Sequence, residues 1–278
     1  MRHLTVTVMP PLAGPLLVPA GIATPHGCVR GLEVEGGRIT ALTNEPELGL
    51  CAALVGHDGG PVVLRYAVAP ADADRPYPEA AFLPRANRYT TAATDLARAS
   101  RAIAEAAGGG HAGIAALVAE AESRFAYAHP EQRFNDGTNS VPYLSCGLTP
   151  GSCVDINTYL VASLRAAGYE AAYVYGYFFP AERGGHTDDG HCWVVTRHAG
   201  EVLEWDIAHH LKAVLGPTRP ALNPRPGQRV ALTHSMGHSY ALPGGSLFLK
   251  ILGEPMHLPT DGPPGWTTLT AKLSSPAA

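Results

Sequence analysis

The chain has 278 residues, of which 46% are hydrophobic and 16% charged, and its formal net charge is −4. This length suits one large domain or two small ones, and the hydrophobic share is enough for a sizeable core. Lys and Arg form no basic stripe, so nucleic acid is not an expected partner. No apolar run is long enough to span a bilayer, so no membrane partner is expected. The sequence carries no signal for the oligomeric state.

The cysteines and the first residues of the sequence indicate the cellular compartment of the protein. The cysteines, at positions 28, 51, 146, 153 and 192, are odd in number, so at least one is free within a monomer. The first residues carry an early positive charge but are soon broken by Pro10, Pro11 and Gly14, which is unlike a signal peptide. We therefore expect a cytoplasmic location in which all the cysteines are thiols.

In chain order, residues 1–88 are expected to form a β-rich N-terminal region. Residues 31–42 alternate apolar and polar side chains around Gly36-Gly37, which predicts a β-hairpin. Residues 62–68 predict another strand. Residues 89–278 then form a second domain that ends in a Pro- and Gly-rich C-terminal extension.

Helical patterns follow the β-rich region. An Ala-rich helix is predicted over residues 91–107, where a Gly-Gly-Gly run ends it, and a second helix over residues 112–125. A long polar segment covers residues 129–152, and loops of this length in compact domains are usually functional. A third helix is predicted over residues 152–167, with Ser152 as its N-cap.

Strands are predicted after the third helix. Residues 169–179 form an aromatic strand, and residues 192–197 and 201–207 form a second hairpin. Two further short strands are expected near residues 230–232 and 246–252.

Cys153 lies in the first turn of the third predicted helix. A helix N-terminus places partial positive charge and unpaired N–H groups beside the sulfur, which favours the thiolate and offers donors to an oxyanion. A neighbouring imidazolium would favour the thiolate further. The alternative is a small buried apolar residue.

His191 and Asp206 are placed together by the second hairpin. If Ala199-Gly200 is a two-residue turn, Trp193 lies opposite Asp206. His191 shares the face of Trp193, so His191 and Asp206 become diagonal neighbours, about 7–8 Å apart at the backbone. A carboxylate there can orient the imidazole toward a thiol. Taken alone, a strand His such as His191 is more often a structural group, and Asp206 alone could simply cap the turn into residues 208–210. A thiol, an imidazole and a carboxylate in this order favour catalysis.

A metal site is not expected. Several possible ligands are neighbours in the sequence, and neighbours on a strand point to opposite faces, so they cannot easily share an ion. We expect Cys192 to be a core residue facing away from His191, and no cofactor is expected. The possible ligands are His186, His191, Cys192, His209 and His210.

These segments resemble the transglutaminase-like superfamily over about residues 90–210. The resemblance rests on residues 151–155, 164–171, 176–177, 191–194 and 204–206, with separations of 38 residues from Cys153 to His191 and 15 from His191 to Asp206. It implies an α+β fold with a papain-like core, in which the nucleophile helix packs on an antiparallel sheet, preceded by the β-rich region. Residues 89–278 would then be the catalytic domain. Cys153 would be the nucleophile, His191 the general base and acid, and Asp206 the residue that orients His191.

The chain departs from the family pattern in two places. Many relatives have an upstream Trp or Gln in the oxyanion hole, but every Trp here follows Cys153. Tyr143 or Asn139 could take that role, although a loop Asn is more often part of a turn, and Trp193 is a further candidate for substrate binding. Ile207 stands where many relatives have Pro after the Asp. Cys146 could form a regulatory disulfide with Cys153, but an ordinary loop thiol is the simpler interpretation.

The expected function is a cysteine-nucleophile enzyme that cleaves an amide through a thioester acyl-enzyme, a peptidase or amidase acting on a peptide, a protein or a small amide. An alternative is an acyltransferase that delivers the acyl group to an amine acceptor and forms an amide bond. An alternative of another class is a catalytically silent scaffold that binds peptides or a partner protein.

Overall fold

The computed structural model describes residues 1–10 and 14–274 and divides into two compact units. Unit 1 comprises Met1–Ala80, Tyr175–His191 and Pro226–Ala278, and unit 2 comprises Ala81–Val174 and Cys192–Arg225. One of the boundaries falls inside strand β12 (Gly190–His198), between His191 and Cys192. Residues 226–278 thus group with the N-terminal strands, whereas the sequence placed them with the second domain.

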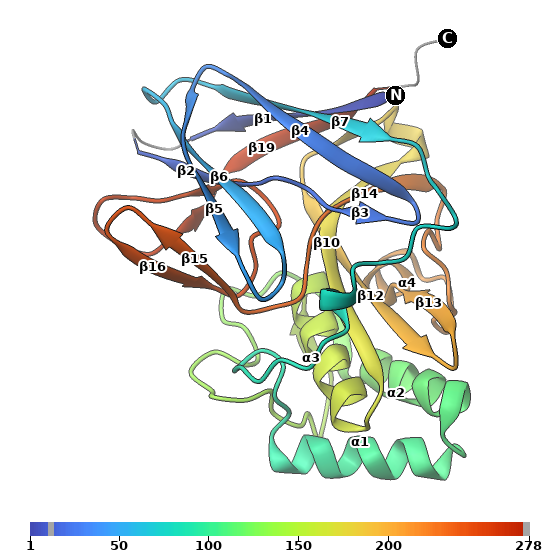
Figure 1. The fold of residues 1–278 in the computed structure, drawn as a ribbon. Coiled ribbons are helices and arrows are strands. Elements are labelled where there is room, and N and C mark those ends of the chain that lie inside the picture. The colour runs from blue at the N-terminus through green and yellow to red at the C-terminus, as the bar shows by residue number, and fades with distance from the viewer. Residues whose placement is uncertain (11–13, 275–278) are drawn as a thin grey trace. The chain divides into compact units, whose positions relative to one another are not determined.

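Unit 1 is built from β-sheets (Figure 1). A six-stranded sheet has the order β11-β19-β1-β7-β4-β3, a five-stranded sheet has the order β18-β17-β2-β6-β5, and β15 and β16 form a hairpin. Short 3-10 turns cover Glu79–Ala81 and Ala181–Arg183. The strands are β1 (Arg2–Met9), β2 (Leu16–Pro19), β3 (Ala23–Thr24), β4 (Gly27–Glu35), β5 (Arg38–Glu45), β6 (Leu50–Gly56), β7 (Val62–Ala69), β11 (His186–Thr187), β14 (Gly227–His234), β15 (His238–Leu242), β16 (Gly245–Leu249), β17 (Met256–His257), β18 (Gly265–Trp266) and β19 (Thr268–Leu273).

The core of unit 1 follows from strand alternation. In β1 and β7 every second side chain is buried, as expected when one face of a sheet packs on a core. The buried cluster takes side chains from both large sheets, so the two sheets face each other across it. Its members include Leu4, Val6 and Val8 of β1, Leu64 and Tyr66 of β7, Leu16 and Val18 of β2, and Val55 of β6.

The predicted hairpin over residues 31–42 is wrong in its pairing, although both strands exist. β4 pairs with β7 in one sheet, and β5 pairs with β6 in the other. Gly36 has φ of +76°, and a Cβ there would lie 2.2 Å from the Pro61 carbonyl oxygen. The Gly-Gly pair therefore lets the chain cross from one sheet to the other instead of closing a hairpin.

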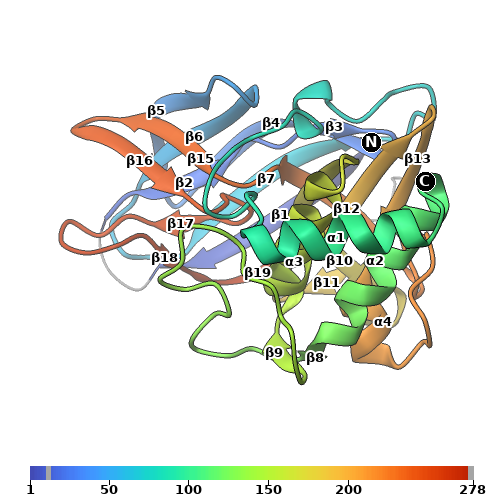
Figure 2. The same cartoon turned by 90° about the horizontal axis from the view of Figure 1, so that it is seen from below.

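Unit 2 holds the helices, which pack against one another (Figure 2). Almost every residue of α3 is buried, so this helix is the centre of the unit. The strand prediction over residues 169–179 is confirmed by β10 (Glu170–Pro180), which begins in unit 2. The other elements are α1 (Thr94–Ala106), α2 (Gly110–Arg124), β8 (Phe125–Tyr127), β9 (Thr149–Gly151), α3 (Cys153–Ala166), β13 (Glu201–Trp205) and α4 (Ile207–Ala213).

The second predicted hairpin is confirmed. β12 and β13 are antiparallel, Ala199 and Gly200 form the turn with positive φ, and the register runs from His198↔Glu201 to Val194↔Trp205. The four-stranded sheet to which they belong has the order β13-β12-β10-β14. Helices beside largely antiparallel sheets make this an α+β fold, as the sequence predicts.

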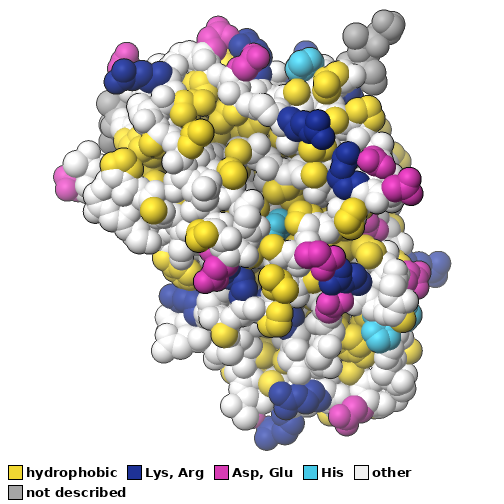
Figure 3. Space-filling model, viewed as in Figure 1, with side chains coloured by type: hydrophobic (Ala, Val, Ile, Leu, Met, Phe, Trp, Pro, Cys, Tyr) yellow, Lys and Arg dark blue, Asp and Glu magenta, His cyan; other side chains and the backbone are white. Residues whose placement is uncertain are grey.

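The surface carries charge of both signs. On the face shown in Figure 3, Lys and Arg side chains lie interspersed with Asp and Glu side chains. This mixed pattern fits the formal net charge of −4. Over residues 1–10 and 14–274, none of the helices combines the length and the apolar character needed to cross a bilayer.

Candidate active site

Cys153 is the first residue of α3, as predicted, and its side chain is a buried thiol that is not part of a disulfide. Ser152 precedes it in extended conformation as the N-cap. The Ser152 N–H donates to Asp155 Oδ2 at 2.9 Å, which is the return bond of a capping box. The helix therefore starts at the candidate nucleophile, and its dipole favours negative charge on the sulfur.

The Arg133 side chain, from the long loop over residues 129–152, is hydrogen-bonded to the first residues at the start of α3. One guanidinium nitrogen of Arg133 donates to Ser152 Oγ at 2.7 Å and to Asp155 Oδ2 at 2.6 Å. Asp155 is fully buried, so its charge needs such a partner. Arg133 thereby neutralises the carboxylate closest in sequence to Cys153 and fixes the loop that precedes α3.

Asn157 ties the nucleophile helix to the strand that carries His191. Its side-chain N–H group donates to the Cys192 carbonyl oxygen at 2.9 Å and lies 3.3 Å from Cys192 Sγ. Burial raises the pKa of the Cys192 thiol well above its ordinary value, and a hydrogen bond with the Cys153 side chain raises it further. Cys192 is thus a core residue, as expected, and it also touches the candidate nucleophile.

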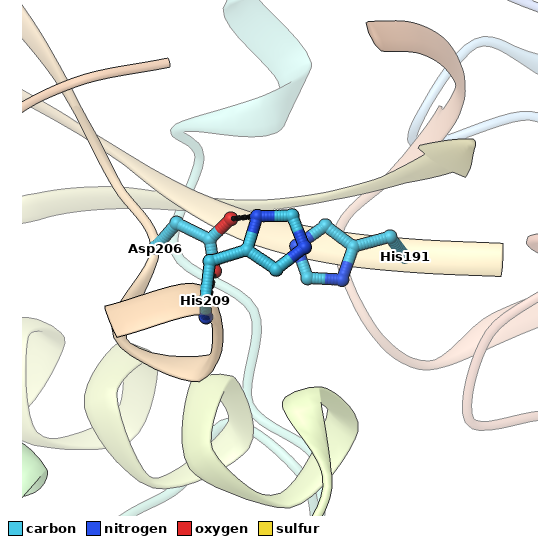
Figure 4. Close-up of side chains that lie close together, drawn as sticks. All are labelled: His191, Asp206 and His209. Atoms are coloured by element: carbon cyan, nitrogen blue, oxygen red, sulfur yellow. Dashed lines mark hydrogen bonds and ion pairs between the residues drawn. The ribbon is translucent and has the colours of Figure 1, made fainter. Parts of the chain in front are cut away.

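Asp206 follows the last residue of β13 and is the N-cap of α4. Its Oδ1 accepts the His209 backbone N–H at 2.9 Å, and its Oδ2 lies 2.9 Å from His209 Nδ1 (Figure 4). His210 Nδ1 lies 2.9 Å from the Asp206 backbone oxygen. The capping role that the sequence offered as an alternative is therefore present, and the same carboxylate also binds an imidazole.

His191 is the second residue of β12 and is buried, with its ring 6.3 Å from that of Phe178. Because β12 is one continuous strand, His191 is anchored through Cys192 to the hairpin that ends at Asp206. One ligand atom from each of His191, Asp206 and His209 lies within 4.8 Å of the others (Figure 4). His191 is the last residue of a segment of unit 1, whereas Asp206 and His209 lie in unit 2, and the pairing of His191 with Asp206 in a triad stays a prediction.

His209 is the residue that sequence reasoning missed, since it was weighed only as a metal ligand. The available signal is its spacing: a residue three positions after an N-cap Asp lies within reach of that carboxylate. Two imidazoles and a carboxylate also suit zinc. Here, however, His209 Nδ1 and Asp206 Oδ2 already bind each other.

The candidate oxyanion and substrate residues lie in different surroundings. The Tyr143 hydroxyl accepts a hydrogen bond from Arg124 at 3.1 Å, and the Arg124 guanidinium lies over the Tyr143 ring. Asn139 is exposed in the long loop, whereas Trp193 is buried in β12. Cys146 is exposed. Their roles in substrate binding or regulation stay predictions.

Comparison with known proteins agrees with this architecture. Residues 97–201 match the model of the transglutaminase-like superfamily, a span that includes Cys153 and His191 and ends before Asp206. A protein from Cytophaga hutchinsonii described as a putative cysteine protease has a similar structure, with a TM-score of 0.50 and 11% identity over 98% of this chain and 97% of that one. A putative protease from Parabacteroides distasonis gives a TM-score of 0.33 and 10% identity over 78% of this chain and 47% of that one. The search of curated proteins gave no match.

Proposed function

Since residues 97–201 match the model of the transglutaminase-like superfamily, we propose that this chain is a cysteine-nucleophile hydrolase that cleaves an amide through a thioester acyl-enzyme. The observation that carries the proposal is the buried Cys153 thiol at the start of α3, a helix that Asn157 ties to the residue directly after His191. A thiol at a helix N-terminus close to an imidazole-bearing strand is the arrangement that activates sulfur nucleophiles.

Each residue of the proposed triad has a role that its position supports. The Cys153 sulfur attacks the amide carbonyl, and the N–H groups of the first turn of α3 stabilise the oxyanion. His191 takes the thiol proton and passes it to the leaving amine. Asp206 holds the His191 imidazole in the orientation that this transfer requires. The C–N bond breaks, and the acyl group stays on the sulfur as a thioester.

The second half of the reaction decides between hydrolase and acyltransferase. Water attacks the thioester in a hydrolase and releases a carboxylic acid, whereas an amine acceptor would give a new amide bond. The proposed substrates are a peptide, a protein or a small amide. We favour water as the acceptor, and an added amine in the assay tests the alternative.

Thiol alkylation tests the nucleophile without knowledge of the substrate. Cys51 and Cys146 are exposed and serve as internal references, whereas Cys153 is buried. At neutral pH, iodoacetamide is expected to alkylate Cys153 at least about tenfold faster than either reference, because only an activated thiol overcomes burial. Peptide mass spectrometry measures the rates, and His191→Ala is expected to remove the preference.

Equal alkylation of all thiols, or a Cys153 preference that survives in His191→Ala, would support the silent scaffold instead. A selective Cys153 leads to the second assay, a peptide library incubated with and without added amines. In that assay Cys153→Ala should lose turnover by several orders of magnitude while unfolding at a similar temperature.

We also propose a cytoplasmic location. No disulfide joins cysteines of residues 1–10 and 14–274, and Cys51 and Cys146 are exposed. Exposed thiols persist in a reducing compartment.

A further inference from the structure

We propose that His209 is a positioning residue of the active site, which holds the Asp206 carboxylate, in its ionised form, in the orientation that His191 needs. The inference rests on the proposed function of the triad and adds to it a residue outside the three. His209 contributes two donors to Asp206, the backbone N–H to Oδ1 and the ring Nδ1–H to Oδ2, both at 2.9 Å.

The hydrogen bonds from His209 matter because the Asp206 carboxylate is buried. Asp206 is 0% exposed and His209 is 6% exposed, so the protein must replace the water that would solvate an ionised carboxylate. An ionised carboxylate has about four lone-pair positions. His209 takes one on each oxygen, which fixes the plane of the carboxylate and leaves acceptor capacity for an N–H of His191.

The ring of His209 has a defined orientation. Because Nδ1 donates to Asp206 Oδ2, the Nδ1 position of the ring carries a proton, which sets the orientation of the ring relative to the carboxylate. Figure 4 shows the ring of His209 beside the Asp206 carboxylate, joined to it by the bond between Nδ1 and Oδ2. The bond from the His209 ring therefore restricts the rotation of the Asp206 carboxylate.

The side chain of residue 209 does more than helix capping requires. Any residue except proline would supply the backbone N–H that Asp206 caps, so the cap alone does not need an imidazole. The extra bond is the one from Nδ1. Asn places an amide nitrogen the same number of bonds from Cα as His Nδ1, whereas Gln places it one bond further away. Asn should therefore substitute for His209 better than Gln or Ala.

The test compares His209→Ala, His209→Asn and His209→Gln by the rate of Cys153 alkylation, with Cys51 and Cys146 as internal references. His209→Ala should slow Cys153 by about 10- to 100-fold, the effect of losing one hydrogen bond to a buried charge. His209→Asn should stay within about threefold of the native rate, and His209→Gln should resemble His209→Ala.

His210→Ala is the matched control. His210 is the next residue of α4, is equally buried and bonds to the Asp206 backbone oxygen instead of the carboxylate. It should lower the midpoint of thermal unfolding while leaving the Cys153 rate within about threefold of native. A purely structural role for His209 would instead make both Ala variants behave alike in both measurements.

Two kinds of failure are distinguishable. If native Cys153 reacts no faster than the references, the proposed function fails and the role of His209 falls with it. If Cys153 is fast and depends on His191, but His209→Ala reacts like native or His209→Asn is as slow as His209→Gln, the triad stands and His209 is not a positioning residue. The Asn and Gln comparison keeps its force even where His209→Ala does not fold.

Discussion

The Asp206 carboxylate serves two groups through its two oxygens. One oxygen caps α4 through the His209 backbone N–H, and the other binds the His209 ring. In the sequence, a turn cap and a catalytic carboxylate look like competing interpretations of one Asp. The structure shows that capping is compatible with binding an imidazole, because the cap uses one oxygen and the His209 ring binds the other.

Cys192 gives a pH-dependent prediction at the same scale. Burial, and then the hydrogen bond with Cys153, raise the pKa of its thiol well above the ordinary value. In the unfolded chain the Cys192 thiol loses its proton at about pH 8.5, whereas in the folded protein it stays protonated at that pH. Unfolding therefore releases a proton above that pH, so the stabilising contribution is complete below about pH 8.5 and declines as the pH rises.

The measurement is the free energy of unfolding of native protein and Cys192→Ala, by denaturant titration under reducing conditions from about pH 7 to 9.5. Native protein should be the more stable at neutral pH, and the difference should shrink above about pH 8.5 by up to about 1.4 kcal/mol per pH unit. Cys28, Cys51, Cys146 and the buried tyrosines are common to both proteins, so their titration cancels. Because Cys153 contacts Cys192, the same comparison in a Cys153→Ala background removes the contribution of the Cys153 thiol. A difference that stays constant across this range would show that Cys192 ionises normally in the folded state.

Local signals in the sequence predicted the elements that carry the candidate site. Ser152 and Gly168 mark the ends of the helix that begins at Cys153, and Ala199-Gly200 sets the register of β12 against β13. His209 was not predictable as a partner of Asp206. Its role depends on a helix of only seven residues, whose start could be read as an ordinary turn.

At the scale of elements, the Asn157 side chain joins α3 to β12. Asn157→Ala would leave the Cys192 carbonyl oxygen buried without this donor and is expected to lower the free energy of unfolding by about 1–3 kcal/mol. It should also slow Cys153 alkylation, because β12 carries His191. Denaturant titration and the alkylation assay measure the two effects.

Ser163→Ala is the control for that variant. Ser163 lies in the same helix and is fully buried, and its hydroxyl has no hydrogen-bond partner among the described residues. Its loss should change the free energy of unfolding by less than about 0.5 kcal/mol, since no bond is broken. Equal effects of the two substitutions would mean that Asn157 acts by filling space and not by joining the elements.

Elements were easier to predict than their partners. The strands on either side of Gly36-Gly37 are present, yet they belong to different sheets. Turn chemistry shows where a chain changes direction but not which strand it then meets. That choice depends on the buried faces of β6 and β7, which lie further along the chain and bury their alternate side chains in the common core.

At the scale of the whole molecule, β19 completes a sheet that begins with β1. Leu4 pairs with Leu273 across almost the full length of the chain, so no local pattern could have predicted this partner. β19 lies between β11 and β1, and its Leu269, Ala271 and Leu273 are buried in the core of unit 1. Residues near the two ends of the described chain therefore stabilise one compact unit together.

Leu269→Ala tests this closure. Removing a buried Leu side chain should lower the free energy of unfolding by about 2–5 kcal/mol, whereas Thr270→Ala, at the exposed neighbouring position, should change it by less than about 0.5 kcal/mol. Hydrogen–deuterium exchange locates the effect. In Leu269→Ala the amides of β1 and β7 should exchange faster, because they share the sheet and core with β19, while those of α1 and α2 in unit 2 should keep their native rates. Faster exchange confined to residues 268–273 would show that β19 is a peripheral strand on which unit 1 does not depend.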